Sequence, residues 1–125
     1  MNPDILFTPF TSPKRPLESR VAMEPMTRQF SPDSVPDDAV LQYYKRRAEN
    51  DVGLIITEGT TVNHKAASNE VRIPGFHGKA LDSWHKIVET VHAAGGKIAP
   101  QLWHQGGMRR PGEGAYPSPG RRIPP

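Results

Sequence analysis

The most informative part of the sequence reads Gly95-Gly96-Lys97-Ile98-Ala99-Pro100-Gln101-Leu102-Trp103-His104-Gln105-Gly106-Gly107. Two glycines end a helical pattern, a short apolar run follows, and Gln101, His104 and Gln105 lie within this run or just after it. This order is typical of a buried strand with a functional loop at its carboxyl end, where α/β sheets and barrels bind ligands. Pro100 has no amide hydrogen, so we expect the strand either to bulge there or to begin pairing after it.

Two earlier segments have the same form. Residues 54–59, Leu-Ile-Ile-Thr-Glu-Gly, are a run of branched aliphatic residues that ends in polar residues and glycine, which is typical of a parallel strand buried on both faces. Residues 21–23 form a shorter apolar run that Pro25 ends, and they predict a first strand of about four residues. Thr27 and Arg28 then lie in the loop at the carboxyl end of this first strand.

Helical periodicity separates these strands. The spacing predicts helices over about residues 37–49 and 79–94. Their expected buried faces are Leu41, Tyr44 and Ala48 in the first helix and Leu81, Trp84, Val88 and Val91 in the second. Three strands that alternate with two helices specify crossover connections and hence a parallel sheet of the α/β class. Two helices cannot cover both faces of such a sheet, so we expect the front part of a barrel or of a doubly wound domain, with the sheet incomplete.

The segments outside these elements are rich in proline and glycine. Seven of the 14 prolines lie in the first 36 residues, so residues 4–16 are expected to form an extended arm or loose hairpin, without a helix and with Phe7 and Phe10 buried. Residues 60–78 show little periodicity, and a loop of this length is more often functional or lid-like. Residues 106–125 hold too few apolar side chains to pack as an element, and they are expected to be loop.

Composition limits the classes of function. The 125 residues include no cysteine, so the chain has neither disulfides nor thiolate metal ligands, and we expect a cytoplasmic protein. No apolar run reaches the roughly 18 residues of a membrane span, and the first residues lack the order of a signal peptide. The net charge of +3 comes without a basic stripe interleaved with aromatic residues, which argues against a nucleic-acid partner. The spacing of His64, His77, His85 and His92 does not predict a metal site.

Four motifs occur in order along the chain: Leu6-Phe7-Thr8-Pro9, Pro25-Met26-Thr27-Arg28, Thr57-Glu58-Gly59 and Gln101-Leu102-Trp103-His104. In order and spacing they resemble the opening of the old yellow enzyme family, the flavin-dependent ene-reductases that are also described as NADH:flavin oxidoreductases or N-ethylmaleimide reductases. The resemblance covers about residues 5–110. It implies the amino-terminal part of a (β/α)8 TIM barrel, about three β/α units with the barrel incomplete, and FMN at the carboxyl ends of the strands.

The same resemblance implies a division of the chain and a set of site residues. Residues 1–110 would be the amino-terminal segment of the FMN-binding TIM barrel, and residues 111–125 a loop rich in Pro, Gly and Arg at its truncated end. Pro25 and Met26 would lie beside the flavin through their backbone. Thr27 would donate a hydrogen bond to the flavin carbonyl near N5 and so raise the reduction potential.

The remaining implied contacts concern the ring itself. Gly59 would leave room for the isoalloxazine, and the Gln101 carboxamide would pair with the pyrimidine edge, which requires both a donor and an acceptor. Each residue also has a structural alternative, because Thr27 could cap a turn, Gly59 could serve a tight bend, and Gln101 could satisfy backbone groups at a strand end. A lone histidine such as His104 is more often a packing residue than a catalyst, and Glu24 and Glu58 are too weakly specified to be assigned as an acid-base pair.

The function that the resemblance implies is the reduction of an activated alkene by FMN, with NAD(P)H as the hydride donor. The family's substrate-anion pair, tyrosine proton donor and FMN-phosphate arginines lie in later strands, beyond the position of Pro125. The chain is therefore expected to be an inactive fragment when alone, and whether it is an enzyme by itself stays open. The alternatives are a non-catalytic binding or assembly fragment that pairs through exposed strand edges, and a polyanion-binding chain that uses its arginine pairs.

Overall fold

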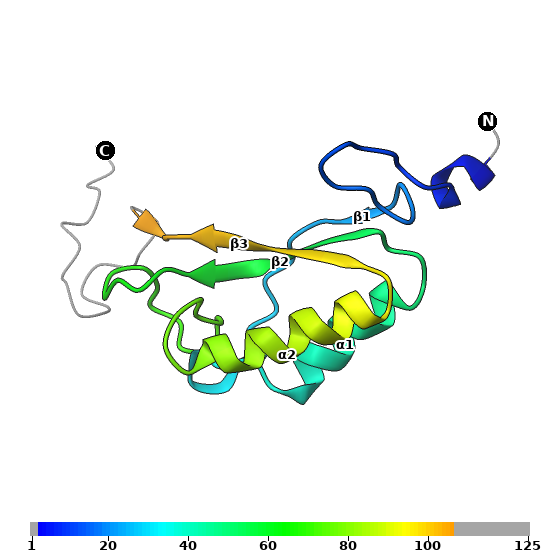
Figure 1. Ribbon diagram of the computed structural model, residues 1–125. Helices are drawn as coiled ribbons and strands as arrows, with labels where there is room; N and C mark the ends of the chain where they lie inside the picture. Colours follow the sequence, from blue (N-terminus) through cyan, green and yellow to red (C-terminus); the bar gives the residue numbers. More distant parts are fainter. Residues whose placement is uncertain (1–2, 107–125) are drawn as a thin grey trace.

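A parallel sheet and two helices form the main body of the molecule. The computed structural model describes residues 3–106 of the 125 residues. The strands are β1 (Ala22–Met23), β2 (Leu54–Thr61) and β3 (Lys97–Trp103), the helices are α1 (Asp38–Ala48) and α2 (Ala80–Ala93), and short 3-10 turns lie at η1 (Pro3–Phe7) and η2 (Pro32–Ser34). The strands are parallel in the order β1-β2-β3, and α1 and α2 lie together on one face of the sheet (Figure 1). The predicted open, three-stranded parallel sheet is confirmed.

Helix α1 begins where the sequence predicts. The Asp37 carboxylate accepts a hydrogen bond from the Val40 amide at 3.1 Å, which satisfies one of the donors that the first helical turn leaves without a partner. The buried residues Val40, Tyr44 and Ala48 are spaced by four, whereas the predicted Leu41 is only partly buried. The predicted range of 37–49 agrees with the structure to within one residue at each end.

Helix α2 packs beside α1 through a face that is rotated from the predicted one. Its buried residues are Ala80, Trp84, Ile87 and Val91. Leu81 is 45% exposed, so its predicted place in the core is wrong, and Val88 is only partly buried. On the helical wheel Ala80 and Ile87 lie on one side of Trp84, and Leu81 and Val88 lie on the other. The Trp84 indole selects the first side, because it donates a hydrogen bond to the Gly75 carbonyl at 2.9 Å.

Strand β2 contains an irregularity opposite Pro100. Ile56 pairs with Ala99 and Gly59 pairs with Gln101, so β2 has one residue more than β3 between these two pairs. Pairing therefore begins before Pro100, and the extra residue lies in the facing strand rather than at the proline. Strand β2 also continues two residues beyond its predicted end at residue 59.

Pro100 faces the outer edge of β3, which pairs with no strand among residues 3–106. The Lys97 amide donates to the Gly53 carbonyl at 3.0 Å, and the Gln101 amide donates to the Thr57 hydroxyl at 3.2 Å. Both donors point toward β2, and backbone groups alternate in direction along a strand, so the nitrogen of Pro100 points to the other side. A proline is tolerated here because no hydrogen bond between β2 and β3 is lost.

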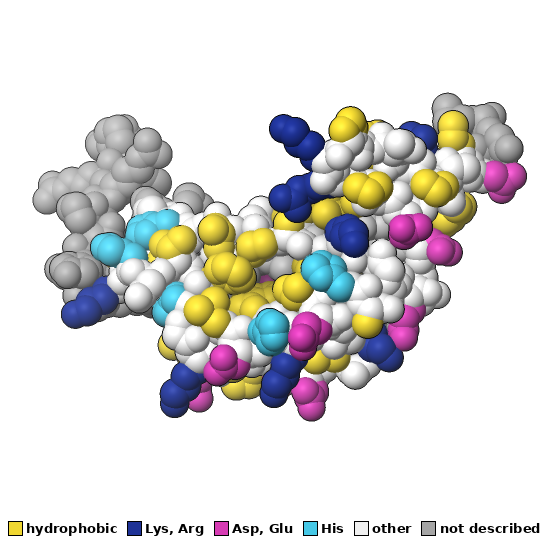
Figure 2. Space-filling model, viewed as in Figure 1, with side chains coloured by type: hydrophobic (Ala, Val, Ile, Leu, Met, Phe, Trp, Pro, Cys, Tyr) yellow, Lys and Arg dark blue, Asp and Glu magenta, His cyan; other side chains and the backbone are white. Residues whose placement is uncertain are grey.

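The amino-terminal arm differs from its prediction in two respects. The predicted hairpin is present, since Phe10 and Leu17 form an antiparallel bridge, but a 3-10 turn occupies residues 3–7, where no helix was expected. Phe7 is 56% exposed and Phe10 is 44% exposed, so their predicted burial is wrong. Hydrophobic side chains lie on the surface of this arm (Figure 2), because the strands and helices of residues 3–106 place no element over it.

The connection between β2 and α2 is packed against the body. Thr61 and Gly75 form an isolated bridge, and Ala66, Ala67 and Ile73 are buried. The predicted loop at residues 111–125 lies outside the described residues. None of the helices in the described part of the chain has the length and apolar composition that crossing a bilayer requires.

Candidate functional site

The predicted site residues lie together at the carboxyl edge of the sheet. Gly59 and Gln101 are register partners in the neighbouring strands β2 and β3, whose arrowheads point to the same side in Figure 1. Thr27 follows β1, and the next residue, Arg28, donates its backbone amide to the Glu58 carboxylate at 3.1 Å. Parallel strands end at one edge of a sheet, and this geometry brings Thr27, Gly59 and Gln101 to that edge. Their roles toward a ligand stay predictions.

The side chains of Thr27 and Gln101 at this edge are exposed. Within residues 3–106, neither the Thr27 hydroxyl nor the Gln101 carboxamide has a hydrogen-bond partner. The backbone of Gln101 is held on both sides, since its amide donates to Thr57 Oγ1 at 3.2 Å and its carbonyl accepts from Thr60 Oγ1 at 3.0 Å. Thr27 therefore caps no turn in this part of the chain, and the Gln101 side chain satisfies no backbone group there.

Gly59 is required by the packing of an aromatic ring. A Cβ atom at this position would lie 2.5 Å from the indole of Trp103, closer than such atoms ever approach. Gly59 lies inside β2 and does not have a positive φ angle, so a tight bend does not explain why this residue is glycine. The indole nitrogen of Trp103 is buried and has no hydrogen-bond partner within the described residues. The space over Gly59 is therefore filled by this chain's own tryptophan.

A buried ion pair lies beneath the edge. The Arg28 guanidinium contacts the Glu58 carboxylate at 3.2 Å, and the side chain of Glu58 is fully buried. Arg28 Cζ also lies 3.5 Å from the centre of the Tyr43 ring, and Arg47 Cζ lies 3.4 Å from it. Sequence reasoning missed this pair. The available signal was a charged residue, Glu58, inside the apolar run of residues 54–59.

Tyr44 connects this ion pair to the helical layer. Its hydroxyl accepts a hydrogen bond from the Glu58 amide at 3.0 Å. Burial raises the pKa of Tyr44 to about 12, since removal from water disfavours the phenolate, although the bond from the Glu58 amide opposes this shift. The charged carboxylate of Glu58 acts in the same direction as burial. The phenol is therefore neutral over the whole physiological range.

Other predicted residues lie near the edge without forming part of a defined cluster. Met26 is 64% exposed and Pro25 is partly buried, and both precede Thr27 in the same loop. His104 follows β3, and its Nε2 atom lies 3.4 Å from Nδ1 of His64, with both rings exposed. Among residues 3–106 no three His, Cys, Asp or Glu side chains come together as a metal site.

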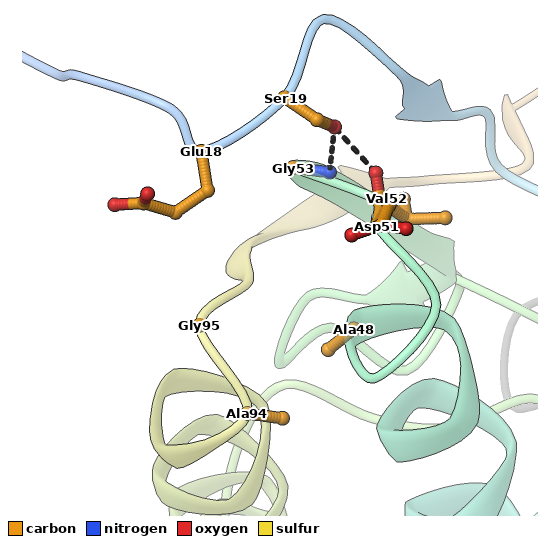
Figure 3. A pocket seen from close by; sticks show the side chains of 8 residues that line it. All are labelled: Glu18, Ser19, Ala48, Asp51, Val52, Gly53, Ala94 and Gly95. Carbon is orange, nitrogen blue, oxygen red and sulfur yellow. Dashed lines mark hydrogen bonds between the residues drawn. The ribbon is translucent and has the colours of Figure 1, made fainter. Parts of the chain in front are cut away.

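The opposite end of the sheet holds a pocket of a different kind (Figure 3). It lies where the carboxyl ends of α1 and α2 approach the start of β2, and its lining includes Ser19, Asp51 and Gly53. The buried Ser19 hydroxyl donates to the Asp51 carbonyl and accepts from the Gly53 amide at 3.0 Å. The Ser19 hydroxyl, the Asp51 carbonyl and the Gly53 amide are therefore already paired with one another.

Comparison with known proteins identifies the family. The sequence pattern of the NADH:flavin oxidoreductase / NADH oxidase family matches residues 5–116. The chain belongs to this family. It is 40% identical over 102 residues to 12-oxophytodienoate reductase 7 of Oryza sativa subsp. japonica, covering 81% of this chain and 25% of that protein. It is 37% identical over 117 residues to chanoclavine-I aldehyde reductase fgaOx3 of Penicillium roqueforti, covering 89% of this chain and 31% of that protein.

Solved structures of the old yellow enzyme family have the same fold over this region. Morphinone reductase in complex with tetrahydroNAD superposes with a TM-score of 0.72 at 45% identity, covering 82% of this chain and 28% of that one. Old Yellow Enzyme from Pichia sp. AKU4542 gives a TM-score of 0.71 at 36% identity, covering 80% and 26%. The three-stranded sheet is therefore part of a TIM barrel of the old yellow enzyme kind, and the chain spans about a quarter to a third of the relatives that it matches.

The residues at the carboxyl edge fit the flavin that the family name implies. A flavin ring presents carbonyl acceptors and N–H donors along one edge, and the Gln101 carboxamide can serve both kinds of group. The Thr27 hydroxyl can donate to a carbonyl, and the exposed Met26 side chain adds apolar surface beside it. The two polar groups are exposed and have no partner among residues 3–106, so a ligand can bind them without displacing an internal hydrogen bond.

Proposed function

We propose that this chain supplies the amino-terminal part of an FMN site in an NAD(P)H-dependent oxidoreductase that reduces activated C=C bonds. The observation that carries the proposal is the pair of unpartnered, exposed polar groups, Thr27 and Gln101, at the carboxyl edge of a parallel sheet. The names of its relatives, which include 12-oxophytodienoate reductases and a probable NADPH dehydrogenase of Candida albicans, support the reaction class. A cytoplasmic location stays a prediction.

The roles of this chain's residues follow from their chemistry. The Gln101 carboxamide would hold the pyrimidine edge, since its backbone is fixed on both sides while its side chain is open. The Thr27 hydroxyl would donate to a flavin carbonyl, and such a donor stabilises the added electron density of a reduced ring. Pro25 and Met26 would line the ring, and Gly59 would leave room for it once the Trp103 indole, which fills the space over Gly59, turns aside. FMN, when bound, supplies hydride transfer between a nicotinamide and an alkene.

We propose further that these 125 residues bind FMN only weakly and do not oxidise NADPH alone. The chain matches only 25% and 31% of two curated relatives, so most of the surface around the ring would come from residues outside the match. FMN mixed with the chain is expected to separate from it during gel filtration. Stoichiometric FMN that stays with the chain through the column would overturn this part of the proposal.

Weak binding can be tested by titrating the ¹⁵N-labelled chain with FMN to millimolar concentration. The backbone amides of Thr27, Gly59 and Gln101 are expected to shift together, whereas those of Gly53 and Gly95, at the other end of the sheet, are not. Riboflavin should shift the same amides, because the proposed contacts are to the ring, and adenosine monophosphate should shift none. If FMN moves no amide at the carboxyl edge, or moves those of Gly53 and Gly95 equally, the proposed flavin contacts are wrong.

A second candidate is self-association through the open strand edges. Within residues 3–106 no strand pairs with the outer edge of β3, and Leu102 in this strand is 55% exposed. Pro100 opposes this function because it removes an outward-facing donor from the middle of that edge. Sedimentation of the chain and of a Pro100→Ala variant tests it. If pairing through β3 occurs, the variant should associate more strongly than the original chain, and equal monomeric behaviour of both would exclude this candidate.

A further inference from the structure

The carboxylate of Glu58 holds the loop that carries Thr27 at two points. Its Oε2 atom accepts the backbone amide of Arg28 at 3.1 Å, and its Oε1 atom contacts the Arg28 guanidinium at 3.2 Å. One acidic side chain therefore fixes both the main chain and the side chain of the residue that directly follows Thr27. Charge-assisted hydrogen bonds of this kind are shorter and stronger than neutral ones, and two of them also restrict orientation.

The surroundings of the ion pair fix the carboxylate in turn. The Arg28 side chain is 13% exposed and lies over the Tyr43 ring at 3.5 Å, with Arg47 at 3.4 Å from the same ring. The amide of Glu58 donates to the hydroxyl of the buried Tyr44 at 3.0 Å. Glu58 is thus anchored to helix α1 through its backbone and to the Thr27 loop through its side chain.

The position of Glu58 within β2 places it between the two predicted flavin contacts. It lies in the stretch between Ile56 and Gly59 where β2 has one residue more than β3. The residue before it, Thr57, accepts the Gln101 amide through its hydroxyl. Consecutive residues of one strand therefore hold the backbone of Gln101 on one side and the loop of Thr27 on the other.

We propose that Glu58 is a positioning residue, which sets the location of Thr27 relative to Gln101 through its two contacts with Arg28. This inference rests on the proposed flavin function, because the spacing of the two polar groups matters only if both bind one ligand. A buried ion pair is weak evidence for a stabilising role by itself, since desolvation offsets much of the attraction. The contact with the Arg28 backbone amide is what ties this pair to the neighbouring Thr27.

The test uses Glu58→Gln, which has the same shape without the charge, and Glu49→Gln as the matched control. Glu49 directly follows α1, and its carboxylate forms an exposed ion pair with Lys45 at 3.0 Å rather than with the loop that carries Thr27. In the Glu58→Gln chain, the heteronuclear ¹H–¹⁵N NOE of Thr27 and Arg28 is expected to fall, while those of β2 and β3 stay unchanged. The control should leave all of them unchanged. Unchanged NOE values at Thr27 and Arg28 in Glu58→Gln would overturn the inference.

FMN titration of the same variants adds a second readout. Glu58→Gln is expected to lose most of the FMN-induced shift of Thr27 and keep that of Gln101, with affinity reduced about tenfold, equivalent to the loss of roughly one hydrogen bond. A Thr27 response equal to that of the original chain would contradict the positioning role. If the original chain shows no response at all, the proposed flavin contact fails, and the NOE measurement still decides whether Glu58 holds the loop.

Arg28→Lys keeps the experiment decisive if Glu58→Gln does not fold. Lysine retains the positive charge and the backbone amide but lacks the planar fork that contacts both the carboxylate and the Tyr43 ring. In this variant the NOE values at Thr27 and at position 28 are expected to lie between those of Glu58→Gln and those of the original chain. Values equal to the original would show that the guanidinium does not restrain the loop.

Discussion

The two ends of the sheet use polar residues in opposite ways. At the amino end, the Ser19 hydroxyl is buried, donates to the Asp51 carbonyl and accepts from the Gly53 amide (Figure 3). It also accepts from the Val21 amide. At the carboxyl end, the Thr27 hydroxyl and the Gln101 carboxamide are exposed and have no partner within residues 3–106. Polar groups that satisfy one another stabilise the fold, whereas polar groups held in place without partners are available to a ligand.

The two ends also differ in what surrounds their glycines, Gly53 directly before β2 and Gly59 within it. A Cβ atom on Gly53 would lie 2.5 Å from the backbone oxygen of Ser19, whereas one on Gly59 would lie 2.5 Å from the indole of Trp103. A backbone atom at the amino end cannot move without disturbing the chain around it. At the carboxyl end the obstacle is the half-buried side chain of Trp103, which can in principle shift without moving the backbone. We therefore expect the amino end to tolerate an added Cβ atom less well than the carboxyl end.

Substituting the two glycines should have the largest effect and should separate the two ends most clearly. Gly53→Ala is expected to lower the free energy of unfolding by about 3 kcal/mol, because the backbone of Ser19 must shift, and Gly59→Ala by about 1 kcal/mol, because only the indole must turn. Urea unfolding followed by circular dichroism measures both values. Equal losses in the two variants would mean that Trp103 is fixed as firmly as the backbone, and that the two ends do not differ in this respect.

Raising the pH tests whether Tyr44, which lies just beneath the carboxyl edge, is as well buried as the polar groups at the amino end. Burial raises the pKa of Tyr44 to about 12, so the folded state favours the neutral phenol. The resulting stability is fully present below the unfolded pKa of about 10 and is lost as the pH rises toward 12, by about 2 to 3 kcal/mol in total. Urea midpoints at several pH values from 9 to 12 measure this loss.

Tyr44→Phe serves as the reference for that measurement. The variant has no phenol to ionise at this position, so its stability should fall less steeply between pH 10 and 12 than that of the original chain. Tyr43→Phe, at the neighbouring position on α1, should leave the steep fall in place. Parallel pH profiles for the original chain and Tyr44→Phe would show that Tyr44 is not shielded from water as its burial indicates.

The two hydroxyls at opposite ends of the sheet give a direct comparison of smaller size. Ser19→Ala is expected to lower the free energy of unfolding by about 2 kcal/mol, because it removes the hydrogen bonds of the buried hydroxyl to the Asp51 carbonyl and to the amides of Gly53 and Val21. Thr27→Val should change it by less than about 0.5 kcal/mol, since an exposed hydroxyl without an internal partner is lost. Thermal melts of both variants test this. A large loss from Thr27→Val would show that its hydroxyl serves the fold.

The sequence predicts the sheet well because each strand contains a short apolar run that proline, glycine or polar residues follow. The runs before Pro25 and Gly59, the run that follows Gly95-Gly96, and the helix start at Asp37 predict three parallel strands and the first helix with errors of one or two residues. The buried stripe of α2 is mispredicted at Leu81, since periodicity alone does not say on which side of Trp84 the core lies. The hydrogen bond from the Trp84 indole to the Gly75 carbonyl, which helps to orient the helix, is not visible in the helical periodicity.

The candidate site shows the same limit. The predicted positions Thr27, Gly59 and Gln101 do meet at one edge, because the direction of the strands follows from local sequence. The Arg28–Glu58 pair escapes prediction, since it joins residues 30 apart through a contact that exists only after the sheet forms. Burial of Phe7 and Phe10 is mispredicted for the converse reason, because an apolar residue is buried only if another element covers it.

Removing the side-chain carboxamide of Gln101 should have the smallest effect on stability, and it is the most specific test of ligand binding at the carboxyl edge. Gln101→Leu keeps the backbone hydrogen bonds to Thr57 and Thr60, and the side chain is exposed, so the free energy of unfolding should change by less than about 0.5 kcal/mol. The variant should nevertheless lose the FMN-induced amide shifts at Gly59 and at position 101, because leucine can neither donate to nor accept from a pyrimidine edge. Gln101→Glu keeps the shape and the acceptor but loses the donor, so it should retain a weaker response than glutamine. If leucine at this position responds to FMN as glutamine does, the carboxamide is not a ligand of the flavin, and the contrast between the two ends of the sheet reflects solvent exposure alone.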